Sequence, residues 1–205
     1  MTTSSASDAR VTVPPFGAGR LLLVGTGAVH VALLPTWVNW LRTSYPSLDV
    51  RTVVTRGAER FVSRTALGVI GGSEVALDVW PDGPVTGAPH VELAEWADAV
   101  AVYPATMNFI SRFALGITDT PVLLALQCTK APVAVSPALP PGAQDNDVLK
   151  AHLAALAARR NVTVVPTVPG RSVTSGQADG GSPPPLPVAL EHLERLRTSQ
   201  KDTRT

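Results

Sequence analysis

The sequence predicts an α/β fold: a single-domain, three-layer, Rossmann-like (flavodoxin-like) arrangement with a mostly parallel sheet and helices on both faces. Two observations predict it. Short, continuously apolar runs, typical of strands buried on both faces, alternate with segments of helical spacing in units of roughly 30 residues. The 205 residues amount to about one domain, and 45% of them are hydrophobic, which is enough to form a core.

The predicted elements begin after a polar segment. Residues 1–19 are rich in Ser, Thr, Pro and Gly, and we expect them to form a flexible N-terminal arm. The apolar run at 20–24 ends in a glycine turn, which predicts a buried strand. Helical spacing over 28–44 predicts a helix that begins late or kinks at Pro35. The same criteria predict strands at 49–54, 99–103, 122–126, 133–135 and 162–165, and helices at 58–67, 91–96, 107–115, 147–160 and 186–196.

Two further segments fall outside this alternation. Residues 169–187 are too rich in Gly, Pro and Ser for a core element, so they predict a long loop, which is either functional or disordered. Residues 198–205 predict a charged C-terminal tail. The domain is therefore expected to span residues 20–197.

The composition excludes several classes of protein. The 17 Lys and Arg against 16 Asp and Glu give a net charge of +1, which argues against nucleic acid or an anionic membrane as a partner. The single cysteine, Cys128, excludes an internal disulfide and any multi-cysteine metal cluster; we expect a small buried side chain at a strand end, and no metal. No signal peptide or membrane-spanning run is visible, so we expect a cytoplasmic protein.

Three strand-to-helix turns carry the residues that could bind a ligand, because ligands collect at the carboxyl edge of such sheets. The first turn is formed by Gly25, Thr26, Gly27 and Ala28. Its N–H groups and hydroxyl suit a phosphate, but glycine turns are also common without one, and the turn lacks a third glycine and the lysine of a P-loop. Thr55, after the second strand, either caps a helix or binds phosphate. The third turn consists of Pro104, Ala105, Thr106, Met107 and Asn108.

The histidines divide into two groups. His90 lies at the start of a short predicted helix on the presumed ligand edge, where an imidazole with a near-neutral pKa can move a proton. The other three, His30, His152 and His192, lie within predicted helices, and we interpret them as structural or exposed.

In this order and spacing, the segments resemble the homo-oligomeric flavin-containing cysteine decarboxylase family, over about residues 21–196. Its members are phosphopantothenoylcysteine decarboxylase and the peptidyl-cysteine decarboxylases of lanthipeptide, linaridin and thioamitide pathways. The most specific likeness lies in His90-Val91-Glu92-Leu93 with Trp96-Ala97-Asp98, and in the third turn. That turn resembles the family's Pro-Ala-Ser-Ala-Asn-Thr flavin motif. The first turn and residues 55–62, with Phe61 at the position of a flavin-neighbouring aromatic, resemble its phosphate-side loops.

The resemblance implies a function. It implies FMN, with FAD as the alternative, bound between neighbouring subunits of a homotrimer, which is often assembled into a homododecamer in the family. It implies His90 as the active-site base, and Asn108 as a residue that holds flavin and substrate. The implied reaction is the oxidative decarboxylation of the C-terminal cysteine of a precursor peptide, for aminovinyl-cysteine ring formation. The flavin accepts a hydride from Cβ, and the resulting C=S group accepts the electrons that CO₂ leaves behind.

The sequence departs from the family pattern in two places. In the coenzyme A branch of the family, a cysteine in the late Gly-rich loop helps return the hydride and give a saturated product. This sequence has Ser175 at about the same position, which predicts an enzyme that stops at the enethiol. The family's Pro-x-Met-Asn motif is replaced by Pro137-Ala138-Leu139-Pro140, and proline has no side-chain donor for a carboxylate. Either Arg171 or Gln144 takes that role, or the substrate differs. The substrate-binding residues are expected to be Arg171, Ser175, Pro137 and Leu139, with residues 169–187 as a substrate-clamp loop.

Three other functions stay open. The first is a phosphopantothenoylcysteine decarboxylase-like enzyme. The second is a flavin prenyltransferase, which needs several basic side chains near the flavin; the loops offer chiefly Arg56, Arg112 and Arg171. The third is an inactive flavin-binding partner subunit, which the missing Pro-x-Met-Asn motif favours.

Overall fold

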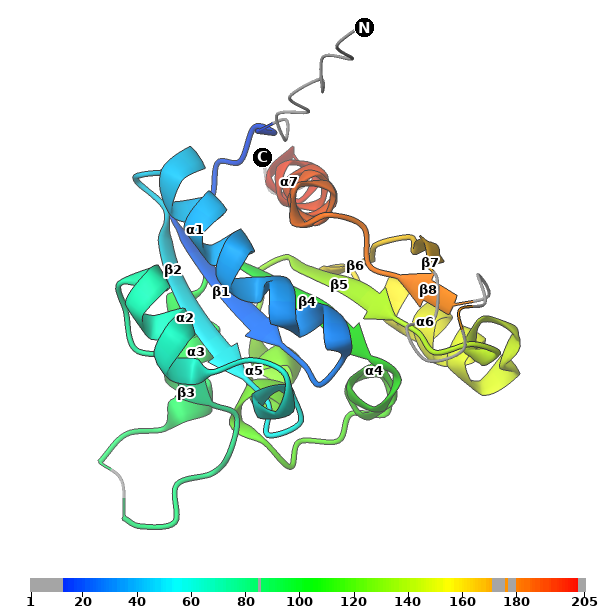
Figure 1. The fold of residues 1–205 in the computed structure, drawn as a ribbon, viewed down its shortest axis with the longest axis horizontal. Helices are drawn as coiled ribbons and strands as arrows, with labels where there is room; N and C mark the ends of the chain where they lie inside the picture. The colour runs from blue at the N-terminus through cyan, green and yellow to red at the C-terminus, as the bar shows by residue number, and fades with distance from the viewer. Residues whose placement is uncertain (1–12, 85, 171–175, 177–179, 203–205) are drawn as a thin grey trace, which may run out of the picture.

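The computed structural model describes residues 13–84, 86–170, 176 and 180–202. Its centre is a six-stranded sheet in the order β3-β2-β1-β4-β5-β6, in which every neighbouring pair is parallel (Figure 1). Without the two-residue edge strand β3, the strands have the 2-1-3-4-5 order of flavodoxin-like folds, so the predicted fold class is confirmed. The strands are β1 (Arg20–Gly25), β2 (Asp49–Val54), β3 (Ala76–Leu77), β4 (Ala99–Thr106), β5 (Val133–Ala138) and β6 (Val162–Val164).

Helices cover both faces of the sheet, and the central strand β1 serves both layers. Its Leu21 and Leu23 join one buried cluster, whereas Leu22 and Val24 join the other, because successive strand side chains point to opposite faces. The first cluster includes side chains from α1 (Leu34–Ser44), α2 (Arg64–Gly71) and α7 (Leu186–Asp202). The second includes side chains from α4 (Met107–Ala114), α5 (Pro121–Cys128) and α6 (Asp147–Ala157), and partly buried side chains of α3 (Pro89–Trp96) pack against it. No helix in the described part of the chain is both long and apolar enough to cross a membrane.

Two predicted helices are divided in the structure. The helix predicted over 28–44 consists of a 3₁₀ helix, η1 (Val29–Leu33), followed by α1 with Pro35 in its first turn. This confirms the prediction that the α-helix begins late. The predicted helix over 58–67 is instead a 3₁₀ turn, η2 (Ala58–Arg60), followed by α2. Ser63 begins α2, because its Oγ accepts a hydrogen bond from Ala66 N at 3.3 Å. At the end of the chain, α7 continues to Asp202, beyond the predicted limit.

The prediction of a strand at 122–126 was wrong, since these residues belong to α5. The helix has a proline in its first turn, and the Thr120 Oγ caps it by accepting from Leu123 N at 3.5 Å. A short apolar run fits a buried helix as well as a buried strand, so the pattern alone did not distinguish them. Cys128 was expected to be buried at a strand end; it is exposed at the C-terminal end of α5.

The predicted loop at 169–187 contains part of a hairpin. The strands β7 (Val168–Gly170) and β8 (Gly180–Ser182) pair antiparallel, and a short 3₁₀ turn, η3 (Ala143–Asp145), lies nearby in the fold. Leu139 N donates to Gly181 O at 2.8 Å, and Gly181 N donates to Leu139 O at 3.2 Å. These two bonds fasten β8 to the chain directly after β5, at the carboxyl edge of the sheet.

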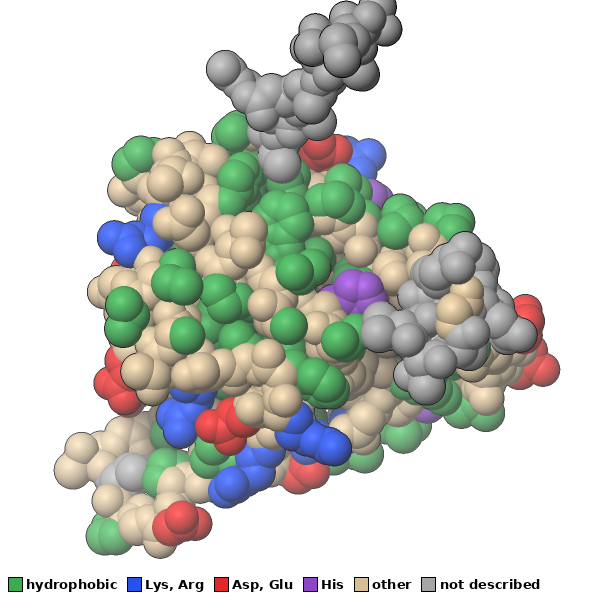
Figure 2. All heavy atoms as spheres, viewed as in Figure 1, with side chains coloured by type: hydrophobic (Ala, Val, Ile, Leu, Met, Phe, Trp, Pro, Cys, Tyr) green, Lys and Arg blue, Asp and Glu red, His purple; other side chains and the backbone are tan. Residues whose placement is uncertain are grey.

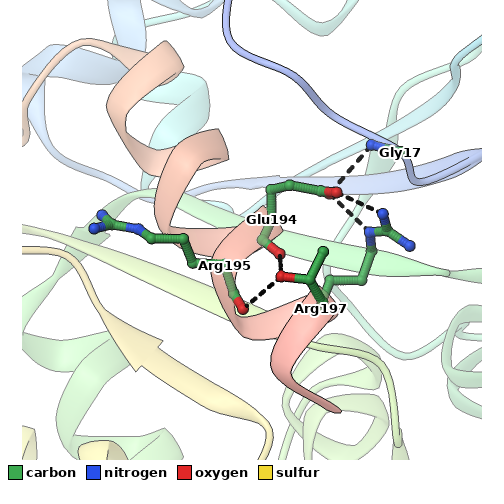
Figure 3. Close-up of polar contacts among 5 residues, drawn as sticks. Gly17, Glu194, Arg195 and Arg197 are labelled. Atoms are coloured by element: carbon green, nitrogen blue, oxygen red, sulfur yellow. Dashed lines mark hydrogen bonds and ion pairs between the residues drawn. The ribbon is translucent and has the colours of Figure 1, made fainter. Parts of the chain in front are cut away.

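Residues 13–19, expected to be part of a flexible arm, contact the helices of one layer. The Tyr45 hydroxyl donates to Pro14 O at 2.6 Å. Gly17 N donates to Glu194 Oε2 at 3.1 Å, and Arg197 Nε donates to the same oxygen at 2.7 Å (Figure 3). This part of the segment is therefore held against α7, while residues 1–12 lie outside the described part of the chain.

Candidate functional site

A cavity of about 980 Å³ lies at the carboxyl edge of the sheet. Its walls come from the segments that follow β1, β2, β3, β4 and β5, and from the hairpin of β7 and β8. The three turns predicted to bind a ligand therefore meet in one place, because the carboxyl ends of parallel strands share one edge.

Two glycines on neighbouring loops, Gly27 and Gly57, line the cavity in close contact with each other. The Cα of Gly27 lies so close to the loop after β2 that a Cβ on Gly27 would be 2.8–2.9 Å from the backbone atoms of Gly57. The N–H groups of Gly27 and Gly57 have no acceptor among the described residues. We call this pair of loops the glycine cradle. It offers free N–H donors and no side chain between them, which suits an anion such as a phosphate.

The hydroxyl of Thr26 connects the first and third turns. Thr26 is 1% exposed, and its Oγ donates to Pro104 O at 2.7 Å and accepts from Thr106 N at 2.8 Å. Thr26 lines the cavity, but this hydroxyl already has two partners in the protein. Its physical role is to hold the end of β4 against the glycine cradle.

Thr55 and Phe61 both line the cavity from the β2 side. The capping alternative for Thr55 is wrong, because the residue that precedes η2 is Gly57 and no side chain caps it. Thr55 instead lies next to the glycine cradle, where its hydroxyl is available to a ligand. Phe61 is 42% exposed, so part of its ring is open to a ligand or to another chain.

The third turn divides into a buried part and a cavity-lining part. Thr106, Met107 and Asn108 line the cavity. Pro104 and Ala105 are buried behind them, and Gly25 is likewise covered, since a Cβ there would lie 2.9 Å from Leu34. The Thr106 Oγ caps α4 by accepting from Phe109 N at 3.3 Å, so the exposed amide of Asn108 is the polar side chain of this turn with no recorded partner.

His90 lies in the first turn of α3 and does not line this cavity. Its ring contacts Trp80 edge-on, with 5.7 Å between ring centroids. Its Nδ1 is buried without a hydrogen-bond partner among the described residues. The chain thus does not bring His90 together with its own predicted cofactor-binding residues.

An acidic group that the sequence analysis missed also lines the cavity. Asp78 is 4% exposed, and its Oδ1 accepts from Val122 N at 2.9 Å, at the start of α5. Burial raises the pKa of Asp78, whereas the bond from Val122 and the nearby Thr120 and Arg112 act in the opposite direction. Arg112 is also paired with Asp119, so its charge is balanced. The described residues contain no cluster of three His, Cys, Asp or Glu side chains that could hold a metal ion.

The predicted substrate-binding residues lie in different places. Leu139 lines the cavity, whereas Pro137 is buried within β5. Gln144 is exposed and does not line the cavity; its amide covers β8 at Gly181. Arg171 and Ser175 lie outside the described residues.

Two basic side chains line the cavity without a hydrogen-bond or ion-pair partner in the part of the chain that the structure describes, His30 and Arg56. His30 was interpreted as structural because it falls within a helical pattern. It lies in η1, directly after the glycine cradle, and burial lowers its pKa. Its closeness to the glycine turn in sequence was the signal that could have identified it.

The fold and the cavity define a protein of the flavin-binding α/β class. The flavoprotein family matches residues 16–183 of the chain. Because this match covers most of the sequence, the chain belongs to the flavoprotein family, and the predicted resemblance is confirmed.

Individual relatives agree with this membership. The cypemycin cysteine dehydrogenase (decarboxylating) of a Streptomyces species is 32% identical over 188 residues, which are 91% of this chain and 96% of the relative. The crystal structure of the cypemycin decarboxylase CypD matches with a TM-score of 0.76 and 30% identity, over 93% of this chain and 99% of that one. The crystal structure of TvaF, an FMN-dependent cysteine decarboxylase from thioviridamide biosynthesis, matches with a TM-score of 0.64 and 29% identity, over 72% and 90%.

Proposed function

We propose that the protein is an FMN-dependent enzyme that oxidatively decarboxylates the C-terminal cysteine of a ribosomally synthesised precursor peptide. The observation that carries the proposal is the meeting of the glycine cradle, Phe61 and Asn108 in one cavity, in a chain 32% identical to a cysteine dehydrogenase (decarboxylating) over 91% of its length. The product is a peptide that ends in an aminoenethiol.

The residues of the cavity fit a flavin mononucleotide. The N–H groups of the glycine cradle and the hydroxyl of Thr55 can hold the phosphate. Phe61 and Met107 offer apolar contacts for the ring system, and the Asn108 amide offers a donor and an acceptor for its polar edge. At about 980 Å³ the cavity is at the upper end of the usual range of ~300–1,000 Å³, so the end of a peptide can enter beside the cofactor.

The chemistry needs an oxidant and a base. When bound, FMN supplies the two-electron oxidation that turns the CH₂–SH group of the cysteine into a thioaldehyde. The base, His90, removes the thiol proton. The Cα–carboxylate bond then breaks, CO₂ leaves, and its electron pair forms the C=C bond while the C=S electrons move onto sulfur. The substrate thus loses two hydrogens and CO₂, and a proton completes the enethiol.

His90 acts in the site of a neighbouring subunit under this proposal. Three observations support that arrangement: His90 does not line its own cavity, its buried Nδ1 has no partner in the described residues, and apolar side chains beside the cavity are exposed. Val29, Leu33 and Phe61 are 46%, 54% and 42% exposed, and Figure 2 shows hydrophobic side chains gathered over α1. A homotrimer, alone or within a homododecamer, would cover such a surface and complete the site.

The fate of the product and the grip on the substrate are also part of the proposal. Ser175, in place of a redox-active cysteine, leaves no thiol to assist return of the hydride, so the reaction stops at the enethiol. The clamp loop at 169–187, with Arg171, is proposed to close over the peptide tail. Support for the clamp comes from β7 and β8, which fasten this segment to the rim of the cavity.

The test combines the cofactor and the reaction. The protein is purified without added flavin, its absorption spectrum is recorded, and the released cofactor is identified by mass as FMN or FAD. The flavin-containing protein is then incubated with a synthetic peptide ending in Cys and, separately, with a matched peptide ending in Ser. We expect the Cys peptide alone to lose CO₂ and two hydrogens. A prenyltransferase would modify its flavin instead, and an inactive partner subunit would change neither the flavin nor the peptide. Colourless protein that takes up neither flavin would refute the proposal.

A further inference from the structure

We infer that His30 is the side chain that holds the carboxylate of the substrate's terminal cysteine, an inference that rests on the proposed function. The imidazole lies in η1, lines the cavity, and has no hydrogen-bond partner among the described residues. It is half-buried, so a bond that it makes there is partly shielded from water.

The wall formed by residues 139–141 has no free donor for a carboxylate. The N–H of Leu139 already donates to Gly181 O at 2.8 Å. Pro140 and Pro141 also line the cavity, and proline has neither an N–H nor a side-chain donor. A carboxylate buried against this wall would lack hydrogen bonds, which is costly for an ionised group. The donor must come from another wall.

Most other donors in the cavity already have partners or are assigned to the cofactor. The Thr26 hydroxyl donates to Pro104 O, and Thr120 interacts with Asp78. Arg112 is paired with Asp119. Asn108 and Thr55 are assigned above to the flavin. Among the described lining residues, His30, Arg56 and Ser182 remain with side-chain donors that have no partner in the described part of the chain, and only His30 and Arg56 of these are basic.

The reaction favours the imidazole over the guanidinium. Negative charge leaves the carboxylate as CO₂ departs, so a permanent cation that stabilises the carboxylate before the reaction raises the barrier. A neutral N–H donor positions the group with a smaller penalty. Burial lowers the pKa of His30, which favours the neutral imidazole, and this form donates through one nitrogen. Arg56 is exposed and adjoins Gly57 of the glycine cradle, next to the proposed phosphate.

The test measures binding without turnover. Two unreactive peptides that end in Ser, one with a free carboxylate and one with a C-terminal amide, are titrated into the FMN-loaded protein by calorimetry. A charge-assisted hydrogen bond predicts that the wild type prefers the carboxylate about tenfold or more. His30→Ala and His30→Phe both remove the donor and should reduce this preference to within about twofold. His30→Gln restores a neutral donor and should recover part of it.

His192→Ala serves as the matched control, because His192 lies on α7 and does not line the cavity. It should keep the wild-type preference. Two outcomes overturn the inference: no carboxylate preference in the wild type, or an unchanged preference in both donor-free His30 variants. If Arg56→Gln loses the preference and the His30 variants keep it, the carboxylate is bound by Arg56 instead. Failure of the proposed function is separate, since it appears as wild-type protein that leaves the Cys peptide unchanged.

Discussion

Gly27→Ala tests the glycine cradle directly. The added Cβ would lie 2.8 Å from the carbonyl carbon of Gly57 and 2.9 Å from its Cα and O. The two loops must therefore separate by roughly 0.7 Å to reach the ~3.5 Å optimum for carbon contacts. All three contacts are with backbone, which cannot rotate away as a side chain can. Such overpacking costs about 1–3 kcal/mol, and the displaced N–H groups should weaken FMN binding about tenfold or more.

The assay is a titration of the protein with FMN, followed by quenching of flavin fluorescence, together with urea denaturation of the flavin-free protein. Gly83→Ala is the matched control, because a Cβ there meets no atom within 4 Å. It should leave both the dissociation constant and the free energy of unfolding unchanged. If Gly27→Ala binds FMN with the wild-type dissociation constant, the two loops do not form the phosphate site and the assignment is refuted.

Three further substitutions test other parts of the argument. His90→Asn should leave a yellow, oligomeric protein that does not turn over the Cys peptide; wild-type turnover would exclude the imidazole as the base. Thr26→Val leaves a buried N–H without its acceptor and should lower the free energy of unfolding by about 1–3 kcal/mol, whereas Thr26→Ser should not; equal urea midpoints for both variants would contradict this. The hydrogen bond from Arg197 lowers the pKa of Glu194, so the carboxylate stabilises the fold above the ordinary Glu pKa, and this stability is lost as the pH falls through the lowered value. Glu194→Gln should therefore cost about 1 kcal/mol at pH 7 and nothing in more acidic solution; a cost that is constant with pH would argue against the ion pair.

The cofactor side of the site could be predicted from sequence because it is local. The residues at 25–28 and at 104–108 each lie where a buried strand ends and a helix begins, and any parallel sheet brings such junctions to one edge. Which of their side chains face the cavity could not be predicted. Thr26 has the same hydroxyl as Thr55, yet it already donates to Pro104 O and accepts from Thr106 N at the end of β4.

The parts that sequence reasoning missed depend on contacts between distant segments. Asp78 directly follows a two-residue strand that no apolar pattern marks, and its carboxylate meets α5 across 44 positions of the chain. The same contact helps explain the misassigned strand, since a carboxylate acceptor at the N-terminus of α5 stabilises a helix there. His30 shares the spacing of a helical residue, and only the fold turns it toward the cavity.

The sequence by itself determined five of the six strands of the parallel sheet, the glycine turn after the first of them and the flavoprotein resemblance, because each depends on neighbouring residues: apolar runs buried on two faces, and backbone that must stay free of side chains. The tertiary structure decided that the run at 122–126 is a helix, that His90 lies away from the cavity of its own chain, and that His30 lines it. These outcomes depend on packing and hydrogen bonds between segments far apart in the chain, whose energies no local pattern encodes.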